Sequence, residues 1–273
     1  MTDQAEKASQ FRALHKGPGA FLIANAWDAG TARILAGLGF PALASSSGAE
    51  AGTLGRTDGH VTRDEALAHC RAIVEATDLP VSADLEKGFG DEPESAAETI
   101  RLAAEVGLVG GSIEDSTGQP DRPLYDVALA TRRIEAAVAA ARSLPFDFTL
   151  TARAEGFLRG NPDLDDVIAR LQAFEQAGAD VLMAPGLPDL ASVRTVCSAL
   201  SKPFNFMVGI PGRSFMVAEL EAAGVRRISL ATSLYRAAMT GLVDAAREVR
   251  DSGTFGYVDR SIPSRDLNAF MQG

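Results

Sequence analysis

Short apolar segments alternate with longer amphipathic segments from one end of the chain to the other. The apolar segments are only a few residues long, which is the length of buried strands. We therefore predict eight strands, over residues 21–24, 42–45, 81–84, 109–114, 148–152, 180–184, 204–208 and 227–231.

The segments between these strands carry apolar residues at helical spacing, so we expect a helix in each of them. Several are followed within a residue or two by glycine, as at Gly39, Gly107, Gly178 and Gly224, which is typical of the end of a helix. The predicted helices cover residues 29–38, 63–77, 93–106, 127–143, 164–177, 190–200, 214–223 and 233–250.

Eight strands that alternate with eight helices favour a closed (β/α)₈ barrel, a TIM barrel of the α/β class. An open doubly wound sheet is the competing fold, but it usually carries a glycine fingerprint after its first strand, and the turn at 25–30 has none. No change in composition marks a linker, so we predict a single domain over residues 1–273. The irregular tail at 255–273 is expected to form short helical pieces packed on the barrel or on a neighbouring subunit.

Charge and cysteine content exclude several classes of protein. The net charge of −10 and the absence of a basic stripe argue against nucleic acid or an anionic membrane surface as a partner. The first residues lack the pattern of a signal peptide, and no apolar run is long enough to span a bilayer. Cys70 and Cys197 lie far apart, which suits a reducing compartment. We therefore expect a cytoplasmic protein.

Two carboxylates, Asp84 and Glu86, lie one residue apart where a buried strand meets the glycine-rich segment 87–90. At about 5 Å they repel each other by roughly 3 kcal/mol at an effective dielectric constant of about 20. A hard divalent cation removes that repulsion, and Mg²⁺ commonly binds one or two carboxylates together with water and substrate oxygens. The motif predicts a magnesium site, with a solvated acidic loop as the alternative.

Polar residues also follow most of the other predicted strands, and in a barrel the active site lies at these carboxyl ends. These positions are Asn25, Trp27 and Asp28, the serines at 45–47, Asp84 and Glu86, Glu114 and Asp115, Arg153 and Glu155, Asn205, and Thr232.

This set of groups suits a small 2-oxo acid. Asp84, Glu86 and Glu114 can hold one Mg²⁺, and Arg153 can bind a carboxylate with two parallel hydrogen bonds. The serine–glycine turn at 45–48 offers hydroxyls and backbone N–H groups to an anion. The metal would bind the keto oxygen and stabilise the enolate that forms when a bond beside the ketone breaks.

For Arg153 a second interpretation stays open, namely a structural ion pair with Glu155 or Glu114. His15 and His69 are expected to be surface or packing residues. His60, beside Asp58, could reach the site, but we do not expect it to be catalytic.

The motifs resemble those of the isocitrate lyase/phosphoenolpyruvate mutase superfamily along residues 21–250. The resemblance rests on the segments 25–28, 45–48, 52–55, 84–90, 113–115 and 152–155. It implies Mg²⁺ at Asp84, with Mn²⁺ as the alternative ion, and Glu86, Glu114 and Asp58 reaching the metal through water. It also implies that substrate is held by Trp27, the Ser46–Ser47 turn and Arg153.

The resemblance further implies that the last barrel helix crosses to a neighbouring subunit. The helix predicted at 233–250 carries a broad apolar stripe, which fits a large interface. We therefore expect the segment 232–273 to pack on a partner, in a homodimer or a homotetramer.

The loop at 116–125 departs from the superfamily pattern. Lyases of this superfamily carry a Lys-Cys-Gly-His loop there, whose cysteine supplies a proton, and a tyrosine where this chain has Leu43. The phosphonate-handling branch uses a loop with lysine and asparagine, which is equally absent. Decarboxylase-like cleavage is favoured, because loss of CO₂ to a metal-stabilised enolate needs no dedicated acid.

Gly118, Pro120 and Pro123 predict that this loop is a mobile lid. Arg122 is the one lid residue expected to reach into the site, as a permanent cation for a second carboxylate of the substrate.

We therefore predict a Mg²⁺-dependent carbon–carbon lyase that acts on a small 2-oxo or 2-hydroxy (di)carboxylate. One alternative is a mutase or hydrolase that breaks the P–C bond of a phosphonopyruvate-like compound, and another is a 2-oxo-acid binding protein without activity. The predicted catalytic residues are Arg153, Glu114 and Ser46, the substrate-binding residues are Trp27, Ser45, Ser46, Ser47, Asp84, Arg153, Asn205 and Arg122, and the metal ligands are Asp84, Glu86, Glu114 and Asp58.

Overall fold

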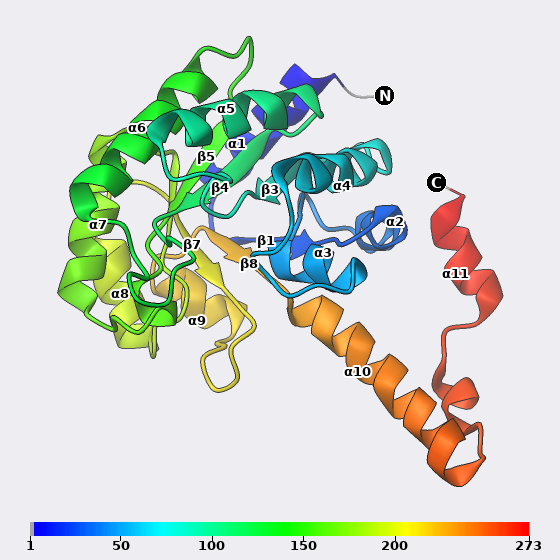
Figure 1. Ribbon diagram of the computed structural model, residues 1–273. Helices are drawn as coiled ribbons and strands as arrows, with labels where there is room; N and C mark the ends of the chain where they lie inside the picture. The colour runs from blue at the N-terminus through cyan, green and yellow to red at the C-terminus, as the bar shows by residue number, and fades with distance from the viewer. Residues whose placement is uncertain (1–2, 273) are drawn as a thin grey trace.

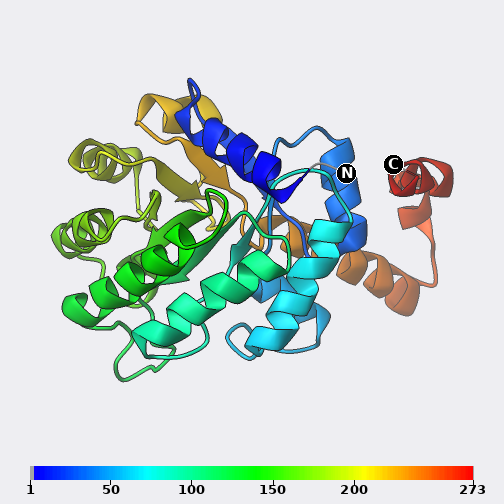
Figure 2. The same ribbon diagram turned by 90° about the horizontal axis from the view of Figure 1, so that it is seen from above.

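The computed structural model describes residues 3–272 and shows a closed barrel of eight parallel strands in chain order, surrounded by helices (Figures 1 and 2). The strands are β1 (Phe21–Asn25), β2 (Leu43–Ala44), β3 (Val81–Asp84), β4 (Gly110–Glu114), β5 (Thr149–Arg153), β6 (Val181–Met183), β7 (Phe204–Met207) and β8 (Arg227–Ser229). The barrel closes where β8 pairs with β1, with Arg227 opposite Phe21. The predicted (β/α)₈ barrel is confirmed.

Each predicted helix is present, with ends that differ by at most three residues from the predicted ones. The helices between and after the strands are α2 (Ala29–Gly37), α4 (Arg63–Glu75), α5 (Pro93–Glu105), α6 (Val127–Arg142), α7 (Leu164–Gln176), α8 (Leu190–Ala199), α9 (Val217–Ala222) and α10 (Ser233–Arg247). Two helices of the barrel region were missed, α1 (Gln4–Lys16) and α3 (Ser47–Thr53).

Helix α1 covers the amino ends of the strands and so closes the floor of the barrel. Its Phe11 is fully buried and packs with Ile23 and Val109 in a small apolar cluster. The ring reaches the first residue of β4, where a β-carbon on Gly110 would lie 2.9 Å from it. The floor is covered in this way, and the cavity of the barrel opens toward the carboxyl ends of the strands.

One buried arginine of α6 fixes the glycine-rich loop after β3. Arg133 is almost fully buried and donates to the carbonyls of Lys87, Gly90 and Asp91. Its guanidinium also lies over the ring of Tyr125, 4.5 Å from the centroid. The outer helix layer therefore holds the loop that carries the predicted metal ligands.

The C-terminal segment forms an arm that leaves the barrel. Helix α10 projects outward (Figure 1), and no residue of α10 is buried within the described part of the chain. After a short 3₁₀ helix (Gly256–Arg260), α11 (Ser264–Met271) returns to α2, where the carbonyl of Met271 accepts from Arg33. The tail is helical in short pieces, as predicted. Whether the arm packs on a partner subunit stays a prediction.

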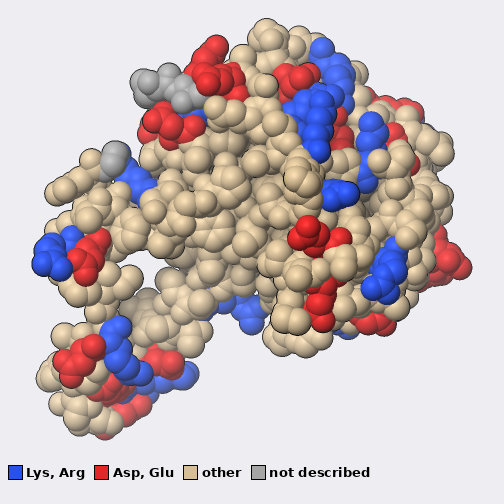
Figure 3. Space-filling model, turned by 180° about the vertical axis from the view of Figure 1, so that it is seen from behind, with Lys and Arg blue, Asp and Glu red and all other residues tan. Residues whose placement is uncertain are grey.

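The surface agrees with the charge of the sequence. On the face drawn in Figure 3 basic and acidic side chains are interspersed, and no extended basic surface forms. Within residues 3–272, no helix has both the length and the apolar character needed to cross a bilayer.

Candidate active site

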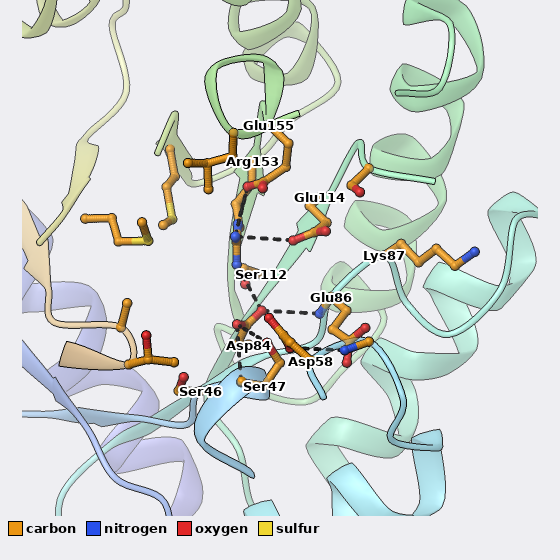
Figure 4. A pocket seen from close by; sticks show the side chains of 18 of the residues that line it. Ser46, Ser47, Asp58, Asp84, Glu86, Lys87, Ser112, Glu114, Arg153 and Glu155 are labelled. Carbon is orange, nitrogen blue, oxygen red and sulfur yellow. Dashed lines mark hydrogen bonds and ion pairs between the residues drawn. The ribbon is translucent and has the colours of Figure 1, made fainter. Parts of the chain in front are cut away.

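A cavity of about 740 Å³ opens at the carboxyl ends of the strands (Figure 4). It is lined mainly by polar side chains from strands β3, β4, β5 and β8 and from the loops that follow β2, β3 and β4. The predicted site residues among them are Ser45, Ser46, Ser47, Asp58, Asp84, Glu86, Glu114 and Arg153. The strand-end rule therefore located the rim of this cavity correctly.

Arg153 lies at the centre of the site and contacts acids from three consecutive strands. Its Nη1 donates to Asp84 Oδ1 (2.9 Å), and its Nη2 lies 2.8 Å from Glu155 Oε1 and 3.3 Å from Glu114 Oε2. Nε also donates to Glu155 Oε1 (3.0 Å). A guanidinium has five N–H groups, so this arrangement leaves one on Nη1 for a ligand.

The charges of these groups depend on one another. Burial, reinforced by Glu155, raises the pKa of Glu114 well above its ordinary value. Burial alone would lower the pKa of Arg153, but Glu155, Asp84 and Glu114 raise it above its ordinary value. The ion pair that the sequence left as the alternative is therefore present, and it leaves Arg153 permanently charged.

The serine turn after β2 forms the start of helix α3. Ser46 is the N-cap and accepts from the backbone N–H of Ala49 (3.4 Å). Ser47 donates from its hydroxyl to Asp84 Oδ2 (3.0 Å), and its backbone N–H points to the same oxygen (3.4 Å). Ser45 accepts from the backbone N–H of Asp84 (3.0 Å). The anion at this turn is thus the protein's own carboxylate.

The backbone after β3 takes an unusual conformation. Glu86 has φ of 48° and Phe89 has φ of 58°, in the left-handed region that side chains other than glycine rarely adopt. The backbone N–H of Glu86 donates to Asp84 Oδ1 (3.3 Å). This bend places the Glu86 side chain beside Asp58 and Asp84 (Figure 4). Such strain is often found where a site requires one particular geometry.

The donor set around Asp84 fits a hard divalent cation bound through a single carboxylate. Burial, then the negative charges of Asp84 and Asp58, raises the pKa of Glu86 to about 7, against the opposing effect of Arg153 and Lys87. Within residues 3–272, no three His, Cys, Asp or Glu side chains converge as direct metal ligands. Mg²⁺ typically keeps several waters and needs only one or two carboxylates.

Three predicted substrate-binding residues do not line the cavity. Trp27 packs edge-on against Tyr235 of α10, with ring centroids 5.5 Å apart. Arg122 is exposed and its nearest hydrogen-bond acceptor is Gln119 (3.5 Å). Asn205 is 0% exposed and donates to the hydroxyl of Ser229 (3.0 Å), so it supports a cavity residue from behind.

The loop at 116–125 is fixed at its base and exposed at its tip. Tyr125 is buried and donates to Asp91 Oδ1 (2.5 Å). Lys87 donates to the same Asp91 oxygen (2.7 Å) and to the carbonyl of Thr117 (2.9 Å), which joins the loop to the segment after β3. Closure of this loop over a ligand stays a prediction.

Sequence reasoning missed several residues of the cavity. Lys87, Ser112, Arg159, Arg227 and Ser229 all line it. A usable signal was present, because alternate residues of a barrel strand face its interior. Counting back two residues from the predicted strand ends would have identified Ser112 and Ser229, and two further residues back on the last strand Arg227.

Comparison with known proteins agrees with the fold and the site. The family model for phosphoenolpyruvate phosphomutase matches residues 11–250. The crystal structure of a candidate lyase/mutase from Burkholderia cenocepacia J2315 is 52% identical, with a TM-score of 0.97 over 99% of this chain and 98% of that chain. The 2-methylisocitrate lyase of Escherichia coli is 29% identical over 231 residues, 81% of this chain and 77% of that protein. The crystal structure of 2,3-dimethylmalate lyase, a member of the PEP mutase/isocitrate lyase superfamily, is 25% identical, with a TM-score of 0.86 over 97% of this chain and 94% of that chain.

The fold and the site define a TIM-barrel enzyme with an acidic, arginine-centred site at the carboxyl ends of its strands. The chain belongs to the phosphoenolpyruvate phosphomutase family, within the isocitrate lyase/phosphoenolpyruvate mutase superfamily. The membership predicted from the sequence motifs is confirmed.

Proposed function

We propose that the protein is a divalent-metal-dependent lyase that cleaves a carbon–carbon bond beside the carbonyl of a small 2-oxo or 2-hydroxy (di)carboxylate. The observation that carries the proposal is the convergence of Arg153, Asp84 and Glu114 at the mouth of the barrel. The lyase names of its relatives 2-methylisocitrate lyase and 2,3-dimethylmalate lyase support the same reaction class.

The chain's own residues bind and orient the ligand. The free Nη1 N–H of Arg153 and the hydroxyl of Ser46 are available to a carboxylate at the rim. Glu155 is fully buried and holds the Arg153 fork with two hydrogen bonds, so the guanidinium keeps one orientation. An oriented cation in a recessed site stabilises negative charge without reorganising during the reaction.

Magnesium is the metal that this site would hold, with Mn²⁺ as the alternative. Asp84 would bind it directly, and Glu86, Asp58 and Glu114 would act through water. A bound ion supplies a Lewis acid for the carbonyl oxygen and for the charge that develops beside it. In the structure Asp84 Oδ1 is shared with Arg153, so we expect metal binding to change that ion pair.

The composition of the loop at 116–125 favours decarboxylation or a similar cleavage. A reaction in which this loop must donate a proton to the substrate is disfavoured. The polar side chains of the loop are two serine or threonine hydroxyls, one amide, Asp121 and Arg122, and Tyr125 is tied to Asp91. Burial, then the bond to Asp91, raises the pKa of Tyr125 above its ordinary value, which makes it a poor acid.

Turnover of a panel of acids with and without Mg²⁺ tests the proposal. The panel contains oxaloacetate, 2-methylisocitrate, 2,3-dimethylmalate and phosphonopyruvate, with products followed by NMR. We expect metal-dependent loss of a C–C bond in at least one dicarboxylate. The family's phosphomutase description favours P–C chemistry as the second candidate, and turnover of phosphonopyruvate alone would establish it. Ligand-induced thermal stabilisation without any turnover would instead identify a 2-oxo-acid binding protein.

We further propose a cytoplasmic homodimer or homotetramer. The exposed apolar side chains of the arm support assembly, and the absence of a disulfide between Cys70 and Cys197 agrees with a reducing compartment.

A further inference from the structure

Arg227 is a buried cation without an acidic partner. It lies at the start of β8, is 4% exposed and lines the cavity. Its Nη1 donates to the hydroxyl of Thr151 (3.2 Å), and its guanidinium lies 5.8 Å from the ring centroid of Phe11. Its Nε has no hydrogen-bond partner, and none of the ion pairs formed within residues 3–272 includes it.

The other cationic side chains of the cavity, Lys87, Arg153 and Arg159, are each paired with a carboxylate. Lys87 pairs with Asp91, and Arg153 and Arg159 both pair with Glu114. Burying an unpaired charge is strongly unfavourable. Burial, then the positive charge of Arg153, lowers the pKa of Arg227 only to about 10, so it remains charged at neutral pH. An anion that reaches the bottom of the cavity would remove this imbalance.

The position of Arg227 follows from the strand register. Thr151, its hydrogen-bond partner, precedes Arg153 by two residues on β5. Residues two apart on a strand face the same side and lie about 6.6 Å apart. The guanidinium of Arg227 therefore lies about one layer of side chains below that of Arg153.

Hydroxyl groups surround the space at this depth. Ser112 is opposite Thr151 in the pairing of β4 with β5, and it lines the cavity. Ser229 also lines the cavity, and it accepts from Asn205 Nδ2 (3.0 Å), which leaves its own O–H free to donate. These hydroxyls and the guanidinium of Arg227 match the oxygens of a carboxylate.

We propose that Arg227, with Ser112 and Ser229, forms a second anion subsite that binds the distal carboxylate of a short dicarboxylate whose other end lies at Arg153. This assignment rests on the proposed function and narrows its substrates to dicarboxylates. The cation that binds the second carboxylate is then Arg227, which lines the cavity, and not Arg122, which does not line it.

Isothermal titration calorimetry with succinate and butyrate in the presence of Mg²⁺ tests the subsite. Arg227→Gln removes the charge, and Arg226→Gln removes the neighbouring exposed arginine as the matched control. We expect Arg227→Gln to weaken succinate binding by about tenfold or more, the effect of one charge-assisted contact. Butyrate should bind equally to all three proteins, and Arg226→Gln should bind succinate like the native protein. Equal succinate affinity of native protein and Arg227→Gln would overturn the proposal.

The subsite could instead bind a separate small carboxylate ion, which is not part of a dicarboxylate. Binding of formate tests this alternative. If formate raises the Tm of the native protein but not of Arg227→Gln, while succinate binds both equally, the subsite holds a free anion and the dicarboxylate assignment is overturned. If formate competes with succinate in the native protein alone, both compounds use Arg227 and the proposal stands.

Folding and turnover are separate readouts. Without ligand, Arg227→Gln should melt at or above the native Tm, because it removes an unpaired buried charge. Should this variant not fold, Arg227→Lys keeps the charge and serves in its place, and it should retain only part of the succinate affinity. Native protein that binds succinate through Arg227 but turns over no acid of the panel would overturn the proposed function and leave the subsite standing.

Discussion

Asp84 connects three parts of the site through one carboxylate. Oδ1 accepts from Arg153 and from the backbone of Glu86, and Oδ2 accepts from Ser47. It ends β3, so it is the acid best fixed by the barrel itself. Asp84 is therefore the residue that we propose as the direct metal ligand.

We expect Asp84→Ala to abolish Mg²⁺ binding and activity together. Activity should fall about a hundredfold or more. Mutation of a residue that only hydrogen-bonds to a metal ligand already lowers metal affinity or activity about 10–100-fold. The fold should survive, because Arg153 keeps Glu114 and Glu155. Calorimetric titration with Mg²⁺ measures the effect. Asp78→Ala, which removes an exposed acid just before β3, is the control, and native Mg²⁺ affinity in Asp84→Ala would refute the metal assignment.

Glu50 and His69 form a second buried pair behind the site, between α3 and α4. His69 Nε2 lies 2.8 Å from the carbonyl of Trp27, so it must carry a proton to donate. Nδ1 then faces Glu50 Oε2 at 3.3 Å and can only accept while the ring is neutral. Burial, then Glu86 and Asp84, raises the pKa of Glu50 to about 7, and burial lowers the pKa of His69. The proton of this pair therefore belongs to Glu50.

This pair predicts a pH-dependent stability. The pKa of Glu50 rises on folding from 4.5 to about 7, so its stabilising proton is fully present below pH 4.5 and is lost as pH rises through about 7. Glu50→Gln keeps a donor for His69 and has no charge to bury. We expect it to raise the free energy of unfolding by roughly 1–3 kcal/mol at alkaline pH, and by little near pH 5.

Urea denaturation of native protein and Glu50→Gln across this pH range measures the difference. Glu75→Gln, which removes an exposed carboxylate from α4, controls for the loss of one negative charge. A stabilisation that stays the same from acid to alkaline pH would contradict the shared proton.

Among the elements, the loop at 116–125 has the least defined role. Its base is tied to the segment after β3 through Lys87 and Tyr125, while Arg122 at the tip stays in solvent. The sequence predicts that Arg122 binds a second carboxylate when the loop closes, and the structure offers Arg227 for that purpose without any movement.

We expect Arg122→Ala to leave KM for a dicarboxylate within about twofold of native, because its side chain does not line the cavity. Steady-state kinetics with a dicarboxylate and with pyruvate measures this. A rise in KM equivalent to roughly 1–3 kcal/mol for the dicarboxylate alone would show that the lid closes and brings Arg122 to the ligand.

At the level of the whole molecule, the arm is the feature that a single chain does not explain. Leu242 is 61% exposed, and Val243, Phe255 and Ile262 are also exposed on α10 and the segment after it. Helix α10 projects from the barrel instead of covering it (Figure 1). Exposed apolar surface of this extent typically marks an interface.

We expect sedimentation velocity to show a stable dimer or tetramer at micromolar concentration. Leu242→Asp should dissociate it, because the new charge would be buried in the interface. Thr240→Asp lies two residues away, nearly on the opposite face of the helix, and should leave the assembly intact. A stable, active monomer of the native chain would exclude the assembly.

The sequence by itself determined the order of the elements, the barrel and most of the rim. Strand and helix periods are local properties, and the carboxyl ends of parallel strands must meet once the barrel closes. Asp84, Glu114 and Arg153 were therefore identified from their positions alone. Helix α1 was missed because its few buried side chains, Phe11 among them, give only a weak apolar pattern.

Only the tertiary structure decided which charges are paired. Arg153 meets Asp84, Glu114 and Glu155 because β3, β4 and β5 are neighbours in a fixed register. Arg227 instead donates to the hydroxyl of Thr151, and it takes part in none of the ion pairs formed within residues 3–272. Trp27 turns away from the cavity to Tyr235 for the same kind of reason, since a distant element packs against it. Which charges form ion pairs, and which side chains are buried, depends on contacts between residues that are far apart in the sequence. A local sequence pattern therefore cannot predict them.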